Sequence, residues 1–229
     1  MSILPGAAVL EDAGLGLQAV IAVADLPPVL AAAMEGYRQL ILFGHAGRRF
    51  WQVLEAGGLS GWDPIDSASR AIVCAWAAEH LAGVRQRLVY PETPGNSAFP
   101  LNLGALGDGL GWQRPSPLGL GIHPHWGTWF AYRAALLADS DLPVTQATPP
   151  QRPCDTCVGQ PCLAACPAGA TAQTGFRVEV CVAYRLRPAS PCASDCPARR
   201  ACPVGREHAY TEAQMRHAYR VSLEMAKIR

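Results

Sequence analysis

The sequence is poor in charged residues, which make up only 16% of its 229 residues. Its 19 basic and 18 acidic side chains leave a formal net charge of +1, and arginine dominates the basic group. This balance lacks the basic footprint typical of nucleic-acid-binding proteins, so we expect no nucleic-acid partner. Half of the residues are apolar, which is enough to form a substantial core in a chain of this length.

Long apolar runs are also missing. The longest apolar region, residues 15–34, is interrupted by Asp25 and by Pro27-Pro28, so it lacks the continuous length of a membrane span. The first five residues show neither the basic segment nor the apolar segment of a secretory signal peptide. These absences predict a cytoplasmic protein that does not contact a membrane.

The nine cysteines are unevenly distributed, because eight of them lie in residues 154–203 and only Cys74 lies outside. Core packing does not produce such clustering, since a buried cysteine behaves simply as a small hydrophobic residue. In a reducing cytosol, closely spaced cysteines more often bind metal than form disulfides. We therefore interpret this window as a metal-binding region and Cys74 as a core residue of a helix.

The dipeptide Cys-Pro occurs twice in the window, at Cys166-Pro167 and Cys202-Pro203. Ferredoxins with two four-iron clusters contain two such runs, and the cysteine before each proline binds the cluster of the other run. Soft thiolates suit this chemistry. Zinc remains the alternative, because the Cys-x-x-Cys spacing of Cys154 and Cys157 is also a zinc spacing, but zinc sites usually use two such pairs. The adjacent Arg199-Arg200 is interpreted as a solvated pair that also offsets negative cluster charge.

The cysteine pattern resembles the C-terminal half of epoxyqueuosine reductases, in which the ligands of two iron–sulfur clusters interleave. The resemblance implies two [4Fe-4S] clusters. It assigns the first to Cys154, Cys157, Cys162 and Cys202, and the second to Cys166, Cys181, Cys192 and Cys196. Two spacings depart from the family pattern, since four residues separate Cys157 from Cys162 and three separate Cys192 from Cys196.

Hydrophobic periodicity and turn residues predict alternating helices and strands in the first part of the chain. We expect strands at 18–24, 38–43, 86–90, 118–122 and 128–137, with the last two forming a hairpin. We expect helices within 5–16, after Pro27-Pro28, and at 48–56, 66–81 and 101–110, with Asp66 or Ser67 as the cap of the fourth. A last helix is expected from Thr211 to the end, with apolar positions at Met215, Ala218, Val221, Met225 and Ile228. The proline-rich linker at 138–153 predicts a boundary between a domain at 1–148 and a domain at 149–229.

A second resemblance lies in the first domain. The run from His123 to Arg133, with Trp126, Gly127 and Trp129, is similar to the His-Pro-x-x-Gly motif and following Trp-Phe strand of the cobalamin-C processing protein. The preceding Asp108-Gly-Leu-Gly-Trp112 resembles the order found in epoxyqueuosine reductases, and reductive dehalogenases share the ferredoxin-like half. These families imply a trimmed nitroreductase-like α/β (α+β) sandwich with a small C-terminal ferredoxin-like iron–sulfur domain.

The resemblances imply a corrinoid-dependent reductase in which two clusters pass single electrons to a cobalamin or to a small substrate. His123, Trp126, Gly127 and Trp129 would line the corrinoid pocket, and a bond from His123 to cobalt is not required. An electron donor such as a flavodoxin or ferredoxin, a small-molecule or corrinoid substrate, and a homodimer are the expected partners.

Two other interpretations remain open, a non-enzymatic ferredoxin-like electron carrier on a degenerate scaffold and a zinc-stabilised binding protein. Epoxyqueuosine reductases also carry a catalytic aspartate about a dozen residues before the Gly-Leu-Gly-Trp run. Residues 94–97 contain no carboxylate here, so queuosine synthesis is not expected.

Overall fold

The computed structural model describes residues 4–34, 36–59, 63–91, 101–149, 151–173 and 175–227. These residues form two compact units, the first from 1–106 and 130–147 and the second from 107–129 and 148–229. The second unit resumes at Thr148 and also contains residues 107–129. The His-Pro-x-x-Gly turn therefore belongs to the same unit as the cysteines.

The first unit is a four-stranded antiparallel sheet covered by helices, in the strand order β1-β2-β6-β3. Its elements are α1 (Ala7–Asp12), β1 (Leu17–Ala22), a 3-10 turn (Val23–Asp25), α2 (Pro28–Ala33), β2 (Gln39–Ala46), α3 (Arg49–Gly57), α4 (Pro64–His80), β3 (Gln86–Tyr90) and β6 (Phe130–Ala138). Helix α5 (Leu103–Leu110) spans the point where the chain passes into the second unit. The strands predicted at 18–24, 38–43 and 86–90 are thus confirmed, although β1 ends at Ala22 and β2 continues to Ala46.

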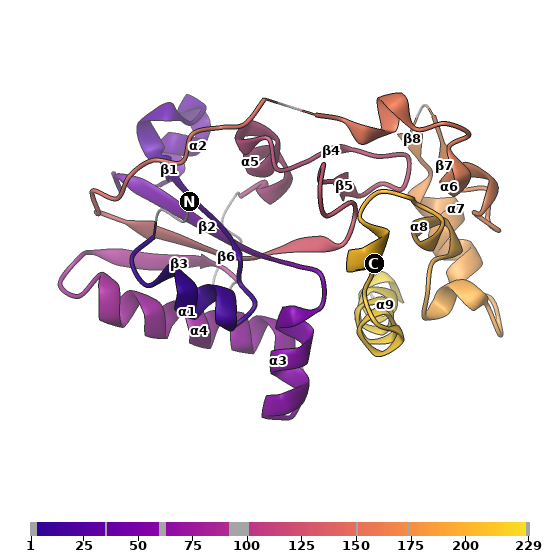
Figure 1. The fold of residues 1–229 in the computed structure, drawn as a ribbon, viewed down its shortest axis with the longest axis horizontal. Coiled ribbons are helices and arrows are strands. Elements are labelled where there is room, and N and C mark those ends of the chain that lie inside the picture. The colour runs from indigo at the N-terminus through magenta and orange to yellow at the C-terminus, as the bar shows by residue number, and fades with distance from the viewer. Residues whose placement is uncertain are drawn as a thin grey trace. The chain divides into compact units, whose positions relative to one another are not determined.

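One face of this sheet carries the main core, where alternate residues of β2 and β6, such as Phe43 and Leu136, pack against α1, α3 and α4. Figure 1 shows α1 and α4 running beside each other along this face of the sheet. Trp76 of α4 meets Phe43 edge-on, with ring centroids 5.5 Å apart. Residues of β2 that alternate with Phe43, such as Leu40 and Leu42, are also fully buried, so both faces of this strand are covered and it reads as a nearly continuous apolar run.

Helix α4 begins earlier than predicted, because Asp63 is its cap. The Asp63 carboxylate accepts a hydrogen bond from the backbone N–H of Asp66 at 3.1 Å, and Pro64 occupies the first turn. The buried side of the helix contains Val73 and Trp76. Cys74 lies on the other side and is exposed, so its interpretation as a core residue is wrong. The hydrophobic periodicity predicted the position of the helix correctly, but the buried side includes Val73 in place of the neighbouring Cys74.

The predicted hairpin of strands 118–122 and 128–137 is also wrong. The short β5 (Gly121–Ile122) pairs with β4 (Arg114–Pro115), whereas β6 pairs with β2 and β3 of the first unit. The backbone N–H of Ser116 donates to the carbonyl of Leu120 at 3.1 Å, and Gly119 between them adopts a positive φ of 68°. This local turn closes β5 onto β4 before the chain reaches the His-Pro turn.

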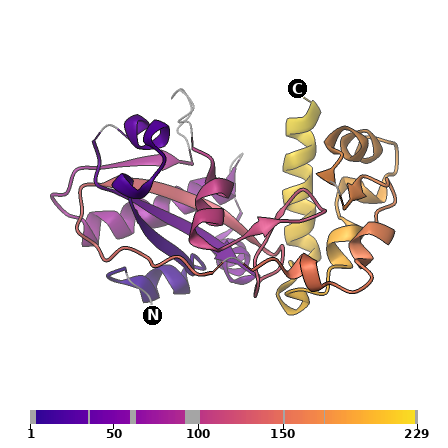
Figure 2. The same cartoon turned by 90° about the horizontal axis from the view of Figure 1, so that it is seen from above.

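The second unit is built from short elements joined by turns, which Figure 2 shows beside the long closing helix α9. They are β4, β5, a 3-10 turn (Pro153–Thr156), α6 (Pro161–Ala164), β7 (Thr171–Ala172), β8 (Gly175–Phe176), α7 (Val178–Arg185), a 3-10 turn (Pro191–Ala193), α8 (Pro197–Arg200), a 3-10 turn (Arg206–His208) and α9 (Glu212–Lys227). Helix α9 starts at the predicted cap, where Thr211 Oγ1 accepts from the N–H of Gln214 at 3.1 Å. Met215 is fully buried but Met225 is exposed, and Ile228 lies outside the described residues.

Among the described residues, no helix combines the length and the apolar character needed to cross a membrane.

Candidate functional site

The second unit brings the eight clustered cysteines together as two groups of four. The first cysteine set is Cys154, Cys157, Cys162 and Cys202, and the second cysteine set is Cys166, Cys181, Cys192 and Cys196. Each set lines a separate cavity. Helices α6 and α8 pack against each other. As a result, Cys166, which follows α6, joins the second set, and Cys202, which follows α8, joins the first.

Short structural elements place the thiols of the first set. Cys154 lies in the turn Pro153–Thr156, Cys162 lies in α6, and Cys202 follows α8. All four cysteines line a cavity of about 20 Å³ together with Pro117, Ile122 and Val204. In this structure the cavity has room for about one water molecule.

Burial raises the pKa of the Cys154, Cys162 and Cys202 thiols, and the neighbouring thiols of the same set raise it further. Without a bound cation, the three thiols are therefore kept in the protonated form. A metal ion or cluster would supply the positive charge that the thiolates need, and its binding would release protons.

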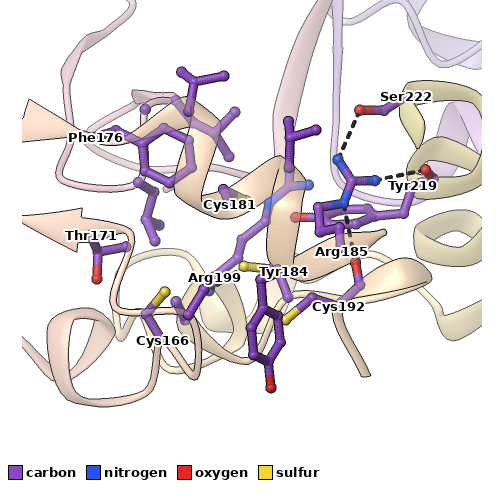
Figure 3. A pocket seen from close by; sticks show the side chains of 18 of the residues that line it. Cys166, Thr171, Phe176, Cys181, Tyr184, Arg185, Cys192, Arg199, Tyr219 and Ser222 are labelled. Atoms are coloured by element: carbon purple, nitrogen blue, oxygen red, sulfur yellow. Dashed lines mark hydrogen bonds between the residues drawn. The ribbon is translucent and has the colours of Figure 1, made fainter. Parts of the chain in front are cut away.

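The second set lines a larger cavity of about 320 Å³, shown in Figure 3. Cys181 comes from α7, Cys192 from the turn Pro191–Ala193, Cys196 caps α8, and Cys166 follows α6. Burial raises the pKa of Cys192 to about 11, with contributions from the thiols of Cys196, Cys181 and Cys166. The pKa of Cys181 is raised mainly by burial as well.

Backbone donors distinguish two thiols of the second set. The N–H of Ala170 donates to Cys166 Sγ at 3.3 Å, and the N–H of Arg199 donates to Cys196 Sγ at 3.4 Å. Burial opposes ionisation of Cys166, but its backbone donors together outweigh burial and lower the pKa of this thiol. Hydrogen bonds to ligand sulfur are one of the means by which proteins tune iron–sulfur centres.

Among the side chains that the structure describes, no three or more His, Cys, Asp or Glu converge closely enough to hold a single metal ion. The thiols of each set surround a space instead. Four soft, anionic donors around one cavity form a donor set that suits an iron–sulfur cluster.

Two buried arginines beside the second set were not identified from the sequence as site residues. Arg185 of α7 and Arg199 of α8 are both more than nine-tenths buried and line the larger cavity. The interpretation of Arg199-Arg200 as a solvated pair is therefore wrong for Arg199, which packs against the rings of Trp129 and Tyr210. Arg200 is partly exposed and pairs with Asp195 at 2.5 Å. The sequence alone does not indicate which of two adjacent arginines is buried in the folded protein.

The His-Pro-x-x-Gly turn is tightly closed. His123 and Gly127 exchange two backbone hydrogen bonds of 2.8 and 3.0 Å. His123 Nδ1 accepts from the N–H groups of His125 and Trp126 at 3.0 and 3.2 Å. Burial, assisted by His125, lowers the pKa of His123 to about 4, so the ring is neutral at pH 7 and carries its proton on Nε2. These bonds make His123 a turn-stabilising residue.

The other residues predicted to line a corrinoid pocket have contacts within the second unit. Gly127 has a positive φ of 58°, and a Cβ atom there would lie 2.1 Å from the carbonyl oxygen of Val204. Trp126 contacts the His208 ring at a centroid distance of 4.2 Å, and Trp129 is buried against Tyr210. The turn thus packs on the loop that follows Cys202. Corrinoid binding by His123, Trp126, Gly127 and Trp129 stays a prediction, and residues 94–97 lie outside the described residues.

The sequence matches no model of a known protein family and no curated protein sequence. Solved structures do match in fold. An epoxyqueuosine reductase with an epoxyqueuosine-modified tRNA-Tyr stem loop matches with 10% identity and a TM-score of 0.54, covering 91% of this chain and 68% of that one. A catabolic reductive dehalogenase in complex with 3-bromo-4-hydroxybenzoic acid matches with 15% identity and a TM-score of 0.55, covering 93% of this chain and 33% of that one.

The B12-trafficking protein CblC of C. elegans, a homologue of human MMACHC, matches with 15% identity and a TM-score of 0.50, covering 89% of this chain and 85% of that one. At these identities the likeness concerns the fold, a mixed α/β architecture with antiparallel sheets. It supports the resemblances seen in the sequence. The chain spans 65% to 68% of the epoxyqueuosine reductase chains and one third of the dehalogenase chain.

Proposed function

We propose that this chain is an iron–sulfur redox protein of the corrinoid-dependent reductase type. The observation that supports it most strongly is the grouping of eight cysteines into two sets of four, each around its own cavity. The grouping follows the interleaved ligand order of dicluster ferredoxins, in which the cysteine of each Cys-Pro dipeptide belongs to the other run's set. In this proposal the first unit is nitroreductase-like and the second is ferredoxin-like.

The residues of the second unit would hold and shield two [4Fe-4S] clusters. Cys154, Cys157, Cys162 and Cys202 would bind one cluster, and Cys166, Cys181, Cys192 and Cys196 would bind the other. When bound, these clusters supply single-electron transfer. The chain's own contribution is to bring the eight thiolates into position, to donate N–H groups to Cys166 and Cys196, and to exclude water with apolar neighbours such as Leu118.

A cobalamin is the proposed electron acceptor, because both families that the His-Pro-x-x-Gly turn resembles handle corrinoids. His123 is unsuited to act as a cobalt ligand, since Nδ1 accepts two backbone hydrogen bonds and Nε2 carries the proton. The proposed corrinoid contacts are therefore those of a pocket wall. The electron donor would be a small redox protein such as a flavodoxin or ferredoxin.

The test is to purify the protein without oxygen, measure iron and acid-labile sulfide, and titrate with hydroxocobalamin while recording the visible spectrum. We expect about eight iron per chain and a saturable change in the corrinoid spectrum. Full iron content without a corrinoid response would overturn the reductase assignment and leave an electron carrier. Zinc in place of iron would overturn the proposal as a whole.

A further inference from the structure

We infer that two buried arginines, Arg185 and Arg199, make the cluster of the second cysteine set the one that accepts an electron first. This inference rests on the proposed function. It concerns the order of reduction within the chain, which the cysteine pattern alone leaves open.

Arg199 is a buried cation whose described partners are all uncharged. Its Nε–H donates to Thr128 Oγ1 at 3.3 Å, and its Nη2 donates to the Thr128 carbonyl. The guanidinium carbon lies 4.4 Å from the Trp129 ring centroid and 4.8 Å from that of Tyr210. Arg199 lines the same cavity as the four cysteines of the second set, and its backbone N–H donates to Cys196 Sγ.

Arg185 lines the same cavity, and the hydrogen bonds of its side chain also go to uncharged groups. Its Nε–H donates to the Cys192 carbonyl at 3.2 Å, and its two terminal nitrogens donate to Ser222 Oγ at 3.2 Å and the Tyr219 carbonyl at 2.8 Å. Figure 3 shows these three bonds, with the Arg185 side chain beside Cys192. The Arg185 guanidinium is therefore hydrogen-bonded directly to a residue of the second set.

Neither arginine forms an ion pair with a carboxylate among the described residues. Burying an unpaired cation is costly, and the usual compensation is a nearby anion. Asp195 lines the same cavity, but its carboxylate pairs with Arg200 at 2.5 Å. The remaining source of negative charge in the cavity is the thiolate set with its bound cluster, so the two arginines are placed to balance that group.

The first set lacks such partners. No charged side chain lines its described cavity. Arg152, which lies near Cys154, is partly exposed and pairs with Asp155 at 2.7 Å, and Arg206 near Cys202 is exposed. Solvent and the paired carboxylate weaken the effect of these two charges on the first set.

This difference determines the order of reduction. Reducing a cluster adds one electron, taken here from dithionite, and the negative charge of the cluster with its four thiolates increases by that electron. A buried cation stabilises the added charge more strongly than a solvated one, because the local dielectric is low. The second cluster should therefore have the higher reduction potential.

The test uses the full chain with its clusters, titrated with dithionite under controlled potential and followed by electron paramagnetic resonance. We expect two reduction steps, and the step at higher potential should disappear in Cys192→Ala but remain in Cys154→Ala. The inference is overturned if the higher step disappears in Cys154→Ala instead, or if both clusters are reduced together. An unmodified protein without iron and sulfide would instead overturn the proposed function, on which the inference depends.

Three variants test the role of charge. Arg199→Gln should weaken electron binding by the second cluster at least tenfold, which corresponds to about 59 mV for one electron. Arg199→Lys keeps the charge and should stay near the unmodified potential, which a purely structural role would not predict. Arg220→Gln removes an exposed arginine of α9 and serves as the control, with no expected shift. If Arg199→Gln loses its cluster, Arg199→Lys decides the question. A change in its reduction potential of about 59 mV or more, which is tenfold in electron binding, would overturn the inference.

Discussion

At the scale of single residues, Gly127 couples the His-Pro-x-x-Gly turn to the first cysteine set. Its positive φ suits glycine, and its Cα faces the carbonyl of Val204, two residues after Cys202. A Cβ atom at Gly205 would likewise lie 2.5 Å from the carbonyl carbon of Trp126. The turn and the loop therefore fit together only with glycine at both positions.

We predict that Gly127→Ala lowers the free energy of unfolding by about 2–4 kcal/mol, because the new Cβ adds backbone strain and a clash. The first cysteine set should also lose iron, since the clash displaces the loop after Cys202. Thermal unfolding and iron content provide the readouts. The matched control is Gly57→Ala at the end of α3, where a Cβ meets no other atom within 4 Å. Equal losses in the two variants would contradict this account.

The thiols of the second set differ in acidity although they share a cavity. Backbone N–H donors lower the pKa of Cys166, whereas burial raises that of Cys192 to about 11. At a given pH, the group with the lower pKa has the larger thiolate fraction, and the thiolate is the reactive form.

In the metal-free protein, we therefore predict that iodoacetamide modifies Cys166 before Cys192 at pH 8, as read by mass spectrometry of peptides. The rate at Cys192 should keep rising as the pH approaches 11. Cys74, which is exposed on α4, reports the reaction of an accessible thiol in the same sample. Faster modification of Cys192 than of Cys166 at pH 8 would show that the backbone donors do not control reactivity.

At the scale of elements, α9 contacts the rest of the second unit through Met215 and through the Tyr219 carbonyl and Ser222 hydroxyl, which accept hydrogen bonds from Arg185. Met215 is fully buried and forms a cluster with Trp129 and Tyr210, and its sulfur lies 3.7 Å from Arg199 Nη1. Farther along the same helix, Met225 is 55% exposed. The apolar stripe of α9 is therefore a packing surface mainly in its first turns.

Met215→Ala should destabilise the protein by about 2–5 kcal/mol, because it leaves a cavity in a closed cluster. Met225→Ala should change stability by less than about 0.5 kcal/mol, as expected for a surface position. Urea unfolding of both variants measures the difference. A cost for Met225→Ala that matched the cost for Met215→Ala would mean that the exposed end of α9 is covered by contacts absent from this structure.

The elements also show what local sequence patterns can and cannot predict. Most strands and helices of the first unit lie where periodicity and turn residues place them, since those signals are local. The pairing of β6 with β2 and β3 is not local, and the Gly119 turn redirects β5 to β4. The hairpin prediction failed because adjacency in sequence was taken as adjacency in the sheet.

At the scale of the whole molecule, the chain passes between its two units three times, after residues 106, 129 and 147. The last passage lies beside the proline-rich linker, whereas no composition change marks the first two. The cysteines could be grouped from the sequence because their order follows a family pattern, although two of their spacings depart from it. The buried arginines could not, because burial of a charge depends on the aromatic rings and carbonyls that tertiary packing brings to it.

The most direct test of the account is the iron and sulfide content of three single-cysteine variants prepared without oxygen. Cys154→Ala and Cys192→Ala should each retain about half of the iron of the unmodified protein, because each removes a ligand from one of two independent sets. Cys74→Ala should retain all of it. Loss of iron in Cys74→Ala, or full iron retention in either of the other two variants, would contradict the assignment of eight cysteines to two cluster sites.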